Sequence, residues 1–244
     1  MAVGGEDRGE APVELRCEGL VRVIGRRHVL REVGFQARGG EVVALVGRNG
    51  AGKTTLLAML AGRRAPDRGR VSMEMAGSEV RGGDLRRLAG FLPHDLLVYP
   101  DLTARENLSF TAVLYGVPDP EQRAVEVLRD IGLEGEGDRL VRTFSRGMQQ
   151  RAAIGRLLVS GARVWLLDEP TTGLDEGGRR WLLSLLARQG RLGRLVIFST
   201  HHPSEVEEAA TRVLVMEGGR LVADLPAGAD GAARAFARME GGGA

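Results

Sequence analysis

Cysteine, lysine and aromatic residues are scarce in this chain of 244 residues. The single cysteine, Cys17, excludes an internal disulfide and is typical of a protein from a reducing compartment. Aromatic residues make up only 4% of the chain, so few side chains could stack on nucleic-acid bases. The net charge is +2 and the pI is near 9.2, but the basic residues are scattered and form no stripe. We therefore expect no nucleic-acid partner.

The sequence also lacks a long hydrophobic run. No apolar run approaches the roughly 20 residues needed to cross a bilayer, and no signal peptide with a basic start and an apolar centre opens the chain. A hydrophobic fraction of 43% and a charged fraction of 27% are ordinary for a globular protein. These features predict a soluble, cytosolic protein with one large α/β domain or two small ones.

The only lysine of the chain lies in the segment 47–55, which fits the phosphate-binding pattern G-x-x-x-x-G-K-[ST]. The apolar run 41–46 before it predicts a buried strand, and residues 56–61 after it predict a helix. A strand, a glycine-rich loop and a helix aim backbone N–H groups at an anion. Lys53 is expected to reach the outer phosphates of a nucleotide and Thr54 to bind Mg²⁺. The predicted nucleotide-contacting residues here are Gly47, Asn49, Gly50, Ala51, Gly52, Lys53, Thr54 and Thr55.

Hydrophobic patterning organises the chain around this loop. Alternation predicts strands over residues 13–23 and 29–35, which pair in a small antiparallel sheet beside the loop. Residues 71–76 alternate in the same way. Thr103 and Glu106 predict a capping box that begins a helix to residue 115, and Asp119 before Pro120 predicts the N-cap of another. These helices belong to a helical subdomain over about residues 91–160, inserted in an otherwise α/β chain.

A buried strand over residues 164–167 ends in two carboxylates, Asp168 and Glu169. The carboxyl end of such a strand faces the phosphate loop. Alternation places the two carboxylates on different sides of the strand, so one can bind a metal ion and the other can orient an attacking water. A further buried strand over 195–199 carries His201, and Asp175 is expected to cap the helix that follows it.

The C-terminal part is expected to be simple. Residues 213–216 and 220–223 predict a hairpin, and the Gly/Ala-rich chain beyond predicts a short helix at most. One domain over residues 1–226 and a flexible tail over 227–244 are expected.

Six landmarks in order resemble the nucleotide-binding subunit of an ATP-binding-cassette (ABC) transporter, over about residues 13–225. They are the loop at 47–54, Pro93-His94, Phe144-Ser145-Arg146-Gly147-Met148, Asp168-Glu169, Gly173-Leu174-Asp175 and Thr200-His201. The resemblance implies an α/β fold of the P-loop NTPase (RecA-like) type, with a small antiparallel β subdomain and an inserted helical subdomain. It also implies ATP and Mg²⁺ as ligands.

The resemblance assigns roles to individual residues. Lys53, Glu169 and His201 would be catalytic; Thr54, Asp168 and His94 would attend Mg²⁺. Ile24 stands where the family often has an aromatic that stacks on adenine. Ser145, Gly147 and Asp175 would also contact nucleotide, the first two in the site of a second copy, which gives a head-to-tail dimer with itself or a homologous subunit.

Two positions depart from the family pattern. His94 replaces the usual loop glutamine, and imidazole is a poorer partner for Mg²⁺ than an amide oxygen. Phe-Ser-Arg-Gly-Met replaces Leu-Ser-Gly-Gly-Gln but keeps Ser145 and Gly147.

The runs 93–108 and 114–116 resemble the ATPase subunit of the haem exporter used in cytochrome c maturation. This implies transport through a separate integral membrane subunit, with the chain held at the cytoplasmic face of the membrane through that partner. ATPases that export drugs, sodium or polysaccharides share Phe-Ser-x-Gly-Met and remain the alternative. A cassette ATPase acting on DNA would carry a long coiled-coil or zinc insertion, and a regulatory module without turnover would lose Glu169 or His201.

Overall fold

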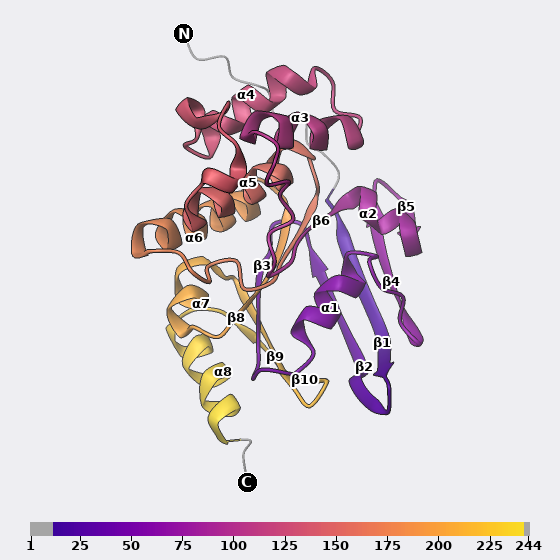
Figure 1. Cartoon of the computed structure of the whole chain (residues 1–244). Coiled ribbons are helices and arrows are strands. Elements are labelled where there is room, and N and C mark those ends of the chain that lie inside the picture. The colour runs from indigo at the N-terminus through magenta and orange to yellow at the C-terminus, as the bar shows by residue number, and fades with distance from the viewer. Residues whose placement is uncertain (1–11, 242–244) are drawn as a thin grey trace.

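A computed structural model describes residues 12–241, and the predicted flexibility of residues 242–244 lies outside this range. Two sheets form the frame of the molecule (Figure 1). Helix α1 lies between them, α6, α7 and α8 lie beyond the larger sheet, and α3 and α4 lie at one end. Within the described residues, no helix is both long and apolar enough to cross a membrane.

The smaller sheet is antiparallel, in the order β2-β1-β4-β5. Its strands are β1 (Glu14–Ile24), β2 (Arg27–Arg38), β4 (Arg68–Met75) and β5 (Ser78–Arg81). The first two confirm the predicted strands and their pairing, and β4 covers most of the alternating segment 71–76 and pairs with β1, a pairing that was not predicted. The edge strand β5 is not predicted, because Val80 is the only apolar residue among its four.

The larger sheet has six strands, in the order β10-β9-β3-β8-β7-β6. They are β3 (Val42–Val46), β6 (Ala89–Leu92), β7 (Val164–Leu167), β8 (Leu195–Thr200), β9 (Arg212–Glu217) and β10 (Arg220–Pro226). All neighbours are parallel except β9 and β10, which form the predicted hairpin. Strands β3, β7 and β8 are buried throughout, as expected when both faces of a parallel sheet are covered.

Eight α-helices and three short 3₁₀ helices join these strands in the described part of the chain. They are α1 (Lys53–Leu60), η1 (Gly82–Asp84), α2 (Leu85–Leu88), α3 (Ala104–Leu114), α4 (Pro120–Asp130), η2 (Glu134–Glu136), η3 (Val141–Thr143), α5 (Arg146–Val159), α6 (Glu176–Arg191), α7 (Pro203–Ala209) and α8 (Ala229–Gly241).

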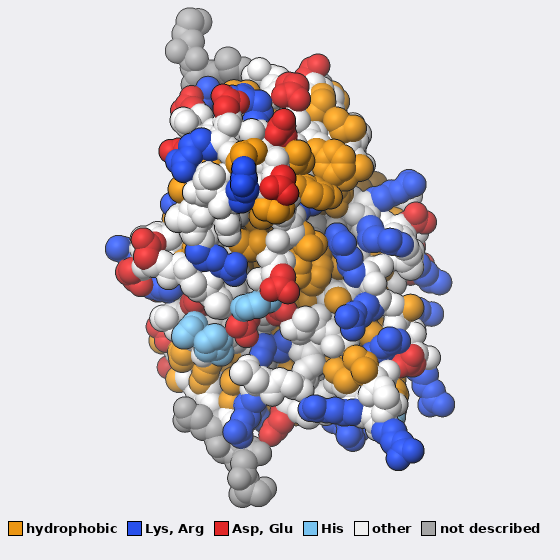
Figure 2. All heavy atoms as spheres, in the orientation of Figure 1, with side chains coloured by type: hydrophobic (Ala, Val, Ile, Leu, Met, Phe, Trp, Pro, Cys, Tyr) orange, Lys and Arg blue, Asp and Glu red, His pale blue; other side chains and the backbone are white. Residues whose placement is uncertain are grey.

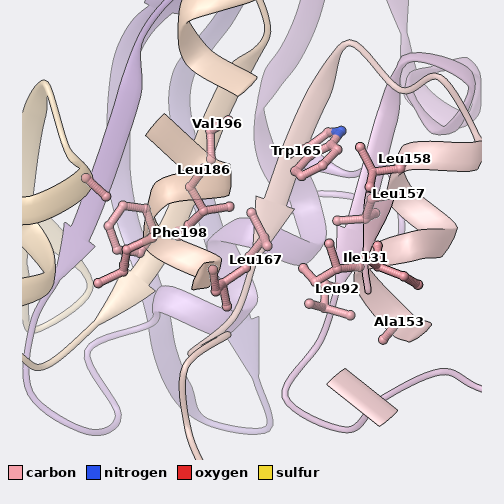
Figure 3. Packing of buried hydrophobic residues seen from close by; sticks show 14 of the residues in the cluster. Leu92, Ile131, Ala153, Leu157, Leu158, Trp165, Leu167, Leu186, Val196 and Phe198 are labelled. Atoms are coloured by element: carbon pink, nitrogen blue, oxygen red, sulfur yellow. The ribbon is translucent and has the colours of Figure 1, made fainter. Parts of the chain in front are cut away.

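Two apolar cores flank the larger sheet, because alternate residues of its strands point to opposite faces. On one face Val43 and Leu45 of β3 pack with α1 and the smaller sheet. On the other face Trp165 and Phe198 pack against α5 and α6 (Figure 3). The strand ends that carry the candidate site are therefore held from both sides.

The N-terminal ends of α3 and α4 test the two helix caps that the sequence predicts. The capping box of α3 is confirmed: the Thr103 hydroxyl accepts the Glu106 N–H at 3.1 Å, and Glu106 accepts the Thr103 N–H at 2.7 Å. Asp119 precedes α4 as predicted, but its side chain makes no capping bond. Its φ of +48° is left-handed, whereas a side-chain cap requires an extended N-cap residue.

The C-terminal region contains a longer helix than the sequence predicts. Helix α8 spans 13 residues, where the sequence predicts a short helix at most. Ala232 and Ala235 are fully buried, and Phe236 and Met239 pack against the same core. Their spacing of three to four residues forms one buried face of a helix. Two of the four side chains on this face are alanines, so the apolar pattern in the sequence is weak. Helix α7 is also absent from the sequence expectations.

Candidate functional site

The loop over residues 47–52 joins β3 to α1, as the phosphate-binding pattern requires. Gly52 has a φ of +105°, a conformation that other residues rarely adopt. A Cβ there would lie 2.8 Å from both the Leu30 side chain and the Val29 carbonyl. Glycine therefore lets the loop pack directly on β2.

Lys53 is the first residue of α1 and is only 6% exposed. Its Nζ donates to the carbonyl oxygens of Gly47 at 2.6 Å and Arg48 at 3.4 Å. Burial lowers the pKa of this ammonium, while the carboxylates of Glu169 and Asp168 act in the opposite direction. An anion bound in the loop would offset the cost of burying the cation.

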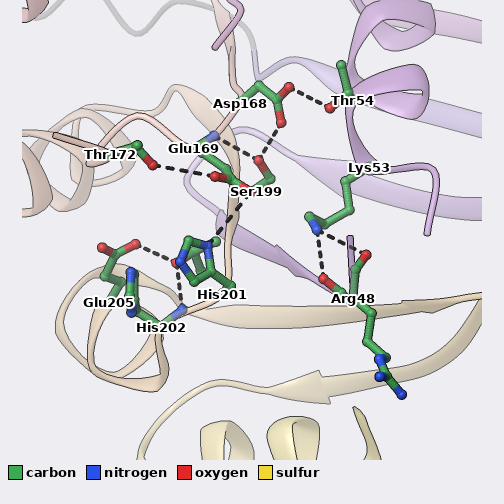
Figure 4. Close-up of polar contacts among 12 residues, drawn as sticks. Arg48, Lys53, Thr54, Asp168, Glu169, Thr172, Ser199, His201, His202 and Glu205 are labelled. Atoms are coloured by element: carbon green, nitrogen blue, oxygen red, sulfur yellow. Dashed lines mark hydrogen bonds and ion pairs between the residues drawn. The ribbon is translucent and has the colours of Figure 1, made fainter. Parts of the chain in front are cut away.

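Thr54 and Asp168 meet across the loop, although 114 residues separate them in the chain (Figure 4). The Thr54 hydroxyl donates to Asp168 Oδ2 at 2.6 Å, and the Ser199 hydroxyl donates to Asp168 Oδ1 at 2.7 Å. Hydroxyl and carboxylate oxygens suit Mg²⁺, which takes one or two carboxylates together with substrate phosphates and water. No group of three or more His, Cys, Asp or Glu side chains that could hold a metal exists among the described residues. The residues fit Mg²⁺ bound jointly with a nucleotide.

Glu169 stands beside this pair with its carboxylate turned to a different set of partners. Its N–H donates to Ser199 Oγ at 2.8 Å, its Oε2 accepts the Thr172 hydroxyl at 3.4 Å, and its Oε1 lies 3.7 Å from His201 Nδ1. The φ of Glu169 is +48°. Such a conformation costs roughly 1–3 kcal/mol in a residue other than glycine, and it occurs most often at functional sites.

His201 lies in the turn after β8, anchored by Thr200 and by two residues that the sequence motifs did not indicate, Ser199 and Glu205. The Thr200 hydroxyl donates to Glu205, which is 1% exposed in α7, and the same oxygen accepts the His202 N–H at 3.0 Å. Together with Ser199, these side chains fix the turn. The position of Ser199 near the end of a fully buried strand is the signal that could have identified it, whereas Glu205 in α7 had no such signal.

A hollow of about 370 Å³ opens over the phosphate loop. It is lined by Ile24, Arg27, Val29, Asn49, Gly50, Ala51, Gly52, Lys53, Thr54, Thr55 and Glu169. The hollow thus combines most of the predicted nucleotide-contacting residues with two of the predicted catalytic residues, Lys53 and Glu169. Ile24 is 46% exposed at its edge, where it offers an apolar contact but no aromatic ring.

Ser145, Gly147 and Asp175 do not line this hollow but lie close to one another. Ser145 caps α5 by accepting the Met148 N–H at 3.3 Å, and Asp175 caps α6 as predicted. A Cβ on Gly147 would lie 3.9 Å from the Leu174 side chain, so the two helix starts adjoin. This second surface contains the predicted nucleotide contacts that lie outside the phosphate loop and the hollow.

His94 also lies outside the lining of the hollow. Its side chain is exposed, and no hydrogen bond joins it to another residue of the described part of the chain. The loop from Pro93 to Thr103 connects β6 to α3, so His94 links the larger sheet to the helical region.

Residues 30–172, more than half of the chain, match the family model described as ABC transporter. Among curated proteins, the chain is 35% identical to the SkfA peptide export ATP-binding protein SkfE of Bacillus subtilis, over 80% of this chain and 82% of that protein. It is 33% identical to the cytochrome c biogenesis ATP-binding export protein CcmA of Nitrosomonas europaea, over 85% of this chain and 98% of that protein.

Two solved structures share the fold. One is an ATP-binding subunit of an ABC transporter, with a TM-score of 0.78 and 30% identity over 87% of this chain and 89% of that one. The other is a dimeric ATP-binding cassette in a post-hydrolysis state with ADP and Pi. It has a TM-score of 0.77 and 22% identity, over 87% of this chain and 98% of the other. These matches confirm the predicted ABC ATPase fold.

Proposed function

Since the chain belongs to the ABC transporter family, whose ATP-binding cassettes hydrolyse ATP to drive transport, we propose that it powers export through a separate integral membrane subunit. The observation that carries this proposal is the convergence of three strand ends. Thr54 follows β3 and the phosphate loop, Asp168 and Glu169 follow β7, and His201 follows β8. Beside the loop, Thr54 contacts Asp168 and Glu169 contacts His201.

The chemistry is phosphoryl transfer to water, in which positioning and charge stabilisation do most of the work. Lys53 and the loop amides would hold the phosphates. Thr54 and Asp168 would hold Mg²⁺, which neutralises charge on the phosphate oxygens when bound. The Glu169 carboxylate would orient the attacking water and accept its proton. The His201 ring, beside Glu169, would contact the terminal phosphate.

We further propose that two chains form an ATP-dependent head-to-tail dimer. The support is the division of predicted contacts between two surfaces, one at the hollow and one around Ser145 and Gly147. A second chain, identical or homologous, would place its Ser145 surface over the hollow. ATP would then be bound by both chains, and its hydrolysis would release them.

For the membrane partner we propose a docking surface on the helical region. We call it the apolar patch; its exposed residues are Leu97, Tyr99, Phe110, Val113, Leu114 and Tyr115. Their exposed fractions lie between 37% and 61%, and Figure 2 shows hydrophobic side chains gathered in this region, over α3. Contiguous exposed apolar side chains mark interaction surfaces. Docking here would hold the chain at the cytoplasmic face of the membrane.

For the cargo we propose haem, in cytochrome c biogenesis, because the run 93–108 resembles that exporter group and CcmA is among the relatives. Export of another compound is the second candidate, because SkfE, named for peptide export, is at least as similar. Co-expression with each membrane subunit separates them. The true partner should co-purify with the chain and raise its ATPase rate, and an Ala substitution at Val113 and Leu114 should abolish both effects.

The variant Glu169→Gln tests the catalytic assignment. It should keep ATP binding but lower turnover at least about 100-fold, the scale of losing a general base. The matched control is Glu207→Gln, the same change at an exposed glutamate of α7, which should stay within about twofold of wild type. Equal turnover in both variants would remove Glu169 from its proposed role.

A further inference from the structure

A second hollow, of about 470 Å³, lies at the C-terminal end of α1, the end opposite the phosphate loop. Its walls come from residues 62–66, from the start of β4 and from the segment that joins β5 to α2. None of its lining residues belongs to the nucleotide hollow. It is therefore a separate feature that the ATPase site does not explain.

The charge of this hollow is entirely positive. Five of its lining residues are arginines, and no described acidic residue lines it; the arginines are Arg63, Arg64, Arg70, Arg81 and Arg86. Arg70 pairs with Glu18 at 2.7 Å and Arg81 with Glu79 at 2.6 Å, both carboxylates outside the lining. Figure 2 shows basic side chains dense on the side where Figure 1 places α2, β4 and β5.

Three of these arginines lack a carboxylate partner among the described residues. Arg63 has its guanidinium 6.0 Å from the centre of the Phe91 ring, and Arg86 donates to the Gly83 carbonyl at 3.1 Å. Arg64 is exposed and forms no ion pair in this part of the chain. Cations after the end of α1 stabilise the helix dipole, which accounts for Arg63 and Arg64. It does not account for Arg86, which reaches the same hollow from α2.

The floor of the hollow is apolar and the walls are fixed. Met59, Val71 and Leu85 line it and are almost fully buried. A Cβ on Gly62 would lie 2.7 Å from the Gly82 carbonyl, so the turn after α1 packs directly against the opposite wall. The hollow is thus preformed, with apolar surface below and guanidinium groups around its rim.

We propose that this hollow binds a phosphate-bearing molecule with an apolar part. Guanidinium forks match phosphate oxygens in pairs, and the apolar part would cover the floor. The molecule is either a free organic phosphate or the headgroup region of an anionic phospholipid. Arg63 also lines a smaller hollow together with Leu97 and Tyr115, so the ligand would lie next to the apolar patch.

The test uses 1-naphthyl phosphate, which combines a phosphate with an aromatic ring. Its binding is measured by calorimetry with the nucleotide hollow saturated by a non-hydrolysable ATP analogue, so that phosphate cannot enter there. Wild type should bind it more tightly than inorganic phosphate. Arg64→Gln/Arg86→Gln should weaken binding at least about tenfold, because two charge-assisted contacts are lost.

The matched control is Arg188→Gln/Arg191→Gln, which removes the same charge from exposed positions of α6. It should bind like wild type, and both double variants should keep the wild-type ATPase rate and melting temperature. If both double variants bind 1-naphthyl phosphate equally weakly, the loss of affinity comes from the change in net charge, and the proposal is overturned. Absence of 1-naphthyl phosphate binding to wild type would overturn it as well.

Vesicles then distinguish the two sources of phosphate. They are made of phosphatidylcholine, with or without phosphatidylglycerol. Retention on the anionic vesicles that is lost in Arg64→Gln/Arg86→Gln but kept in the α6 control assigns the hollow to a lipid headgroup. Binding of 1-naphthyl phosphate without vesicle retention assigns it to a free organic phosphate.

Discussion

Glu169 and His201 show how single residues in this site depend on the backbone that presents them. The left-handed φ of Glu169 turns its carboxylate away from the Thr54–Asp168 pair and toward His201. Ser199 holds both carboxylate residues, since its hydroxyl donates to Asp168 and accepts the Glu169 N–H. Motif and spacing predicted which strand ends carry the residues of this site. They could not predict the strained backbone or Ser199, because both depend on tertiary packing.

The residue that departs most from its family, His94, has a testable role. Its exposed side chain lies in the loop that leads to the apolar patch, outside the nucleotide hollow. We therefore predict that His94→Gln leaves basal ATPase activity unchanged and lowers partner-stimulated activity by about fivefold or more, the scale of an allosteric coupling energy. Basal and stimulated rates across a Mg²⁺ titration provide the measurement.

Asp95→Ala, in the same loop, is the companion variant, because Asp95 could supply an oxygen that the histidine lacks. A change in the Mg²⁺ dependence of the basal rate in either variant would place this loop at the metal and contradict the coupling role.

The lone cysteine gives a prediction about reactivity. Burial among apolar residues raises the pKa of the Cys17 thiol to about 12, while its Sγ donates to the Val33 carbonyl at 3.4 Å. Since the thiolate is the reactive species, the folded protein should resist alkylation by iodoacetamide at neutral pH and react after unfolding in urea. Mass spectrometry checks this, and rapid alkylation of the native protein would show that β1 opens readily.

At the scale of elements, patterning predicted the long and strongly alternating segments and failed on the short or small-residue ones. Strands β3, β7 and β8 are continuous apolar runs, whereas β5 has one apolar residue. The position of Asp119 before α4 was predictable, but its backbone conformation was not. Helix α8 was underestimated because alanine and glycine say little about burial until neighbouring elements are in place.

Helix α8 offers a matched pair of substitutions. Ala235 is fully buried and Ala233 is exposed on the same helix. Ala235→Glu forces a larger, charged side chain into the core and should destabilise the protein by roughly 2–3 kcal/mol. Ala233→Glu should change stability by less than about 0.5 kcal/mol. Urea denaturation measures both.

Trypsin offers a second readout, because Arg234 and Arg238 lie in α8. Undocking should speed cleavage at these arginines only in Ala235→Glu. Equal stability and equal cleavage of the two variants would mean that α8 does not contribute to the folded core.

At the scale of the whole molecule, we propose that one chain presents two separate nucleotide-binding surfaces: its hollow binds its own ATP, and its Ser145 surface covers the ATP of a second chain. The hollow over the phosphate loop has an exposed edge at Ile24, and the Ser145 surface contains predicted contacts that do not line this hollow. The resemblance to the family predicted this division from the sequence. The sequence could not show that the starts of α5 and α6 adjoin, because 30 residues separate their caps.

The dimer is the central claim of this account, and the mass of Glu169→Gln in solution tests it most directly. Size-exclusion chromatography with light scattering is run on this variant with Mg²⁺-ATP, with Mg²⁺-ADP and without nucleotide. The account predicts a dimer with ATP and a monomer in the other two conditions, because the variant binds ATP without hydrolysing it. A further change of Ser145→Arg should return the ATP sample to the monomer. A monomer at saturating ATP, or a dimer that Ser145→Arg leaves intact, would contradict the account.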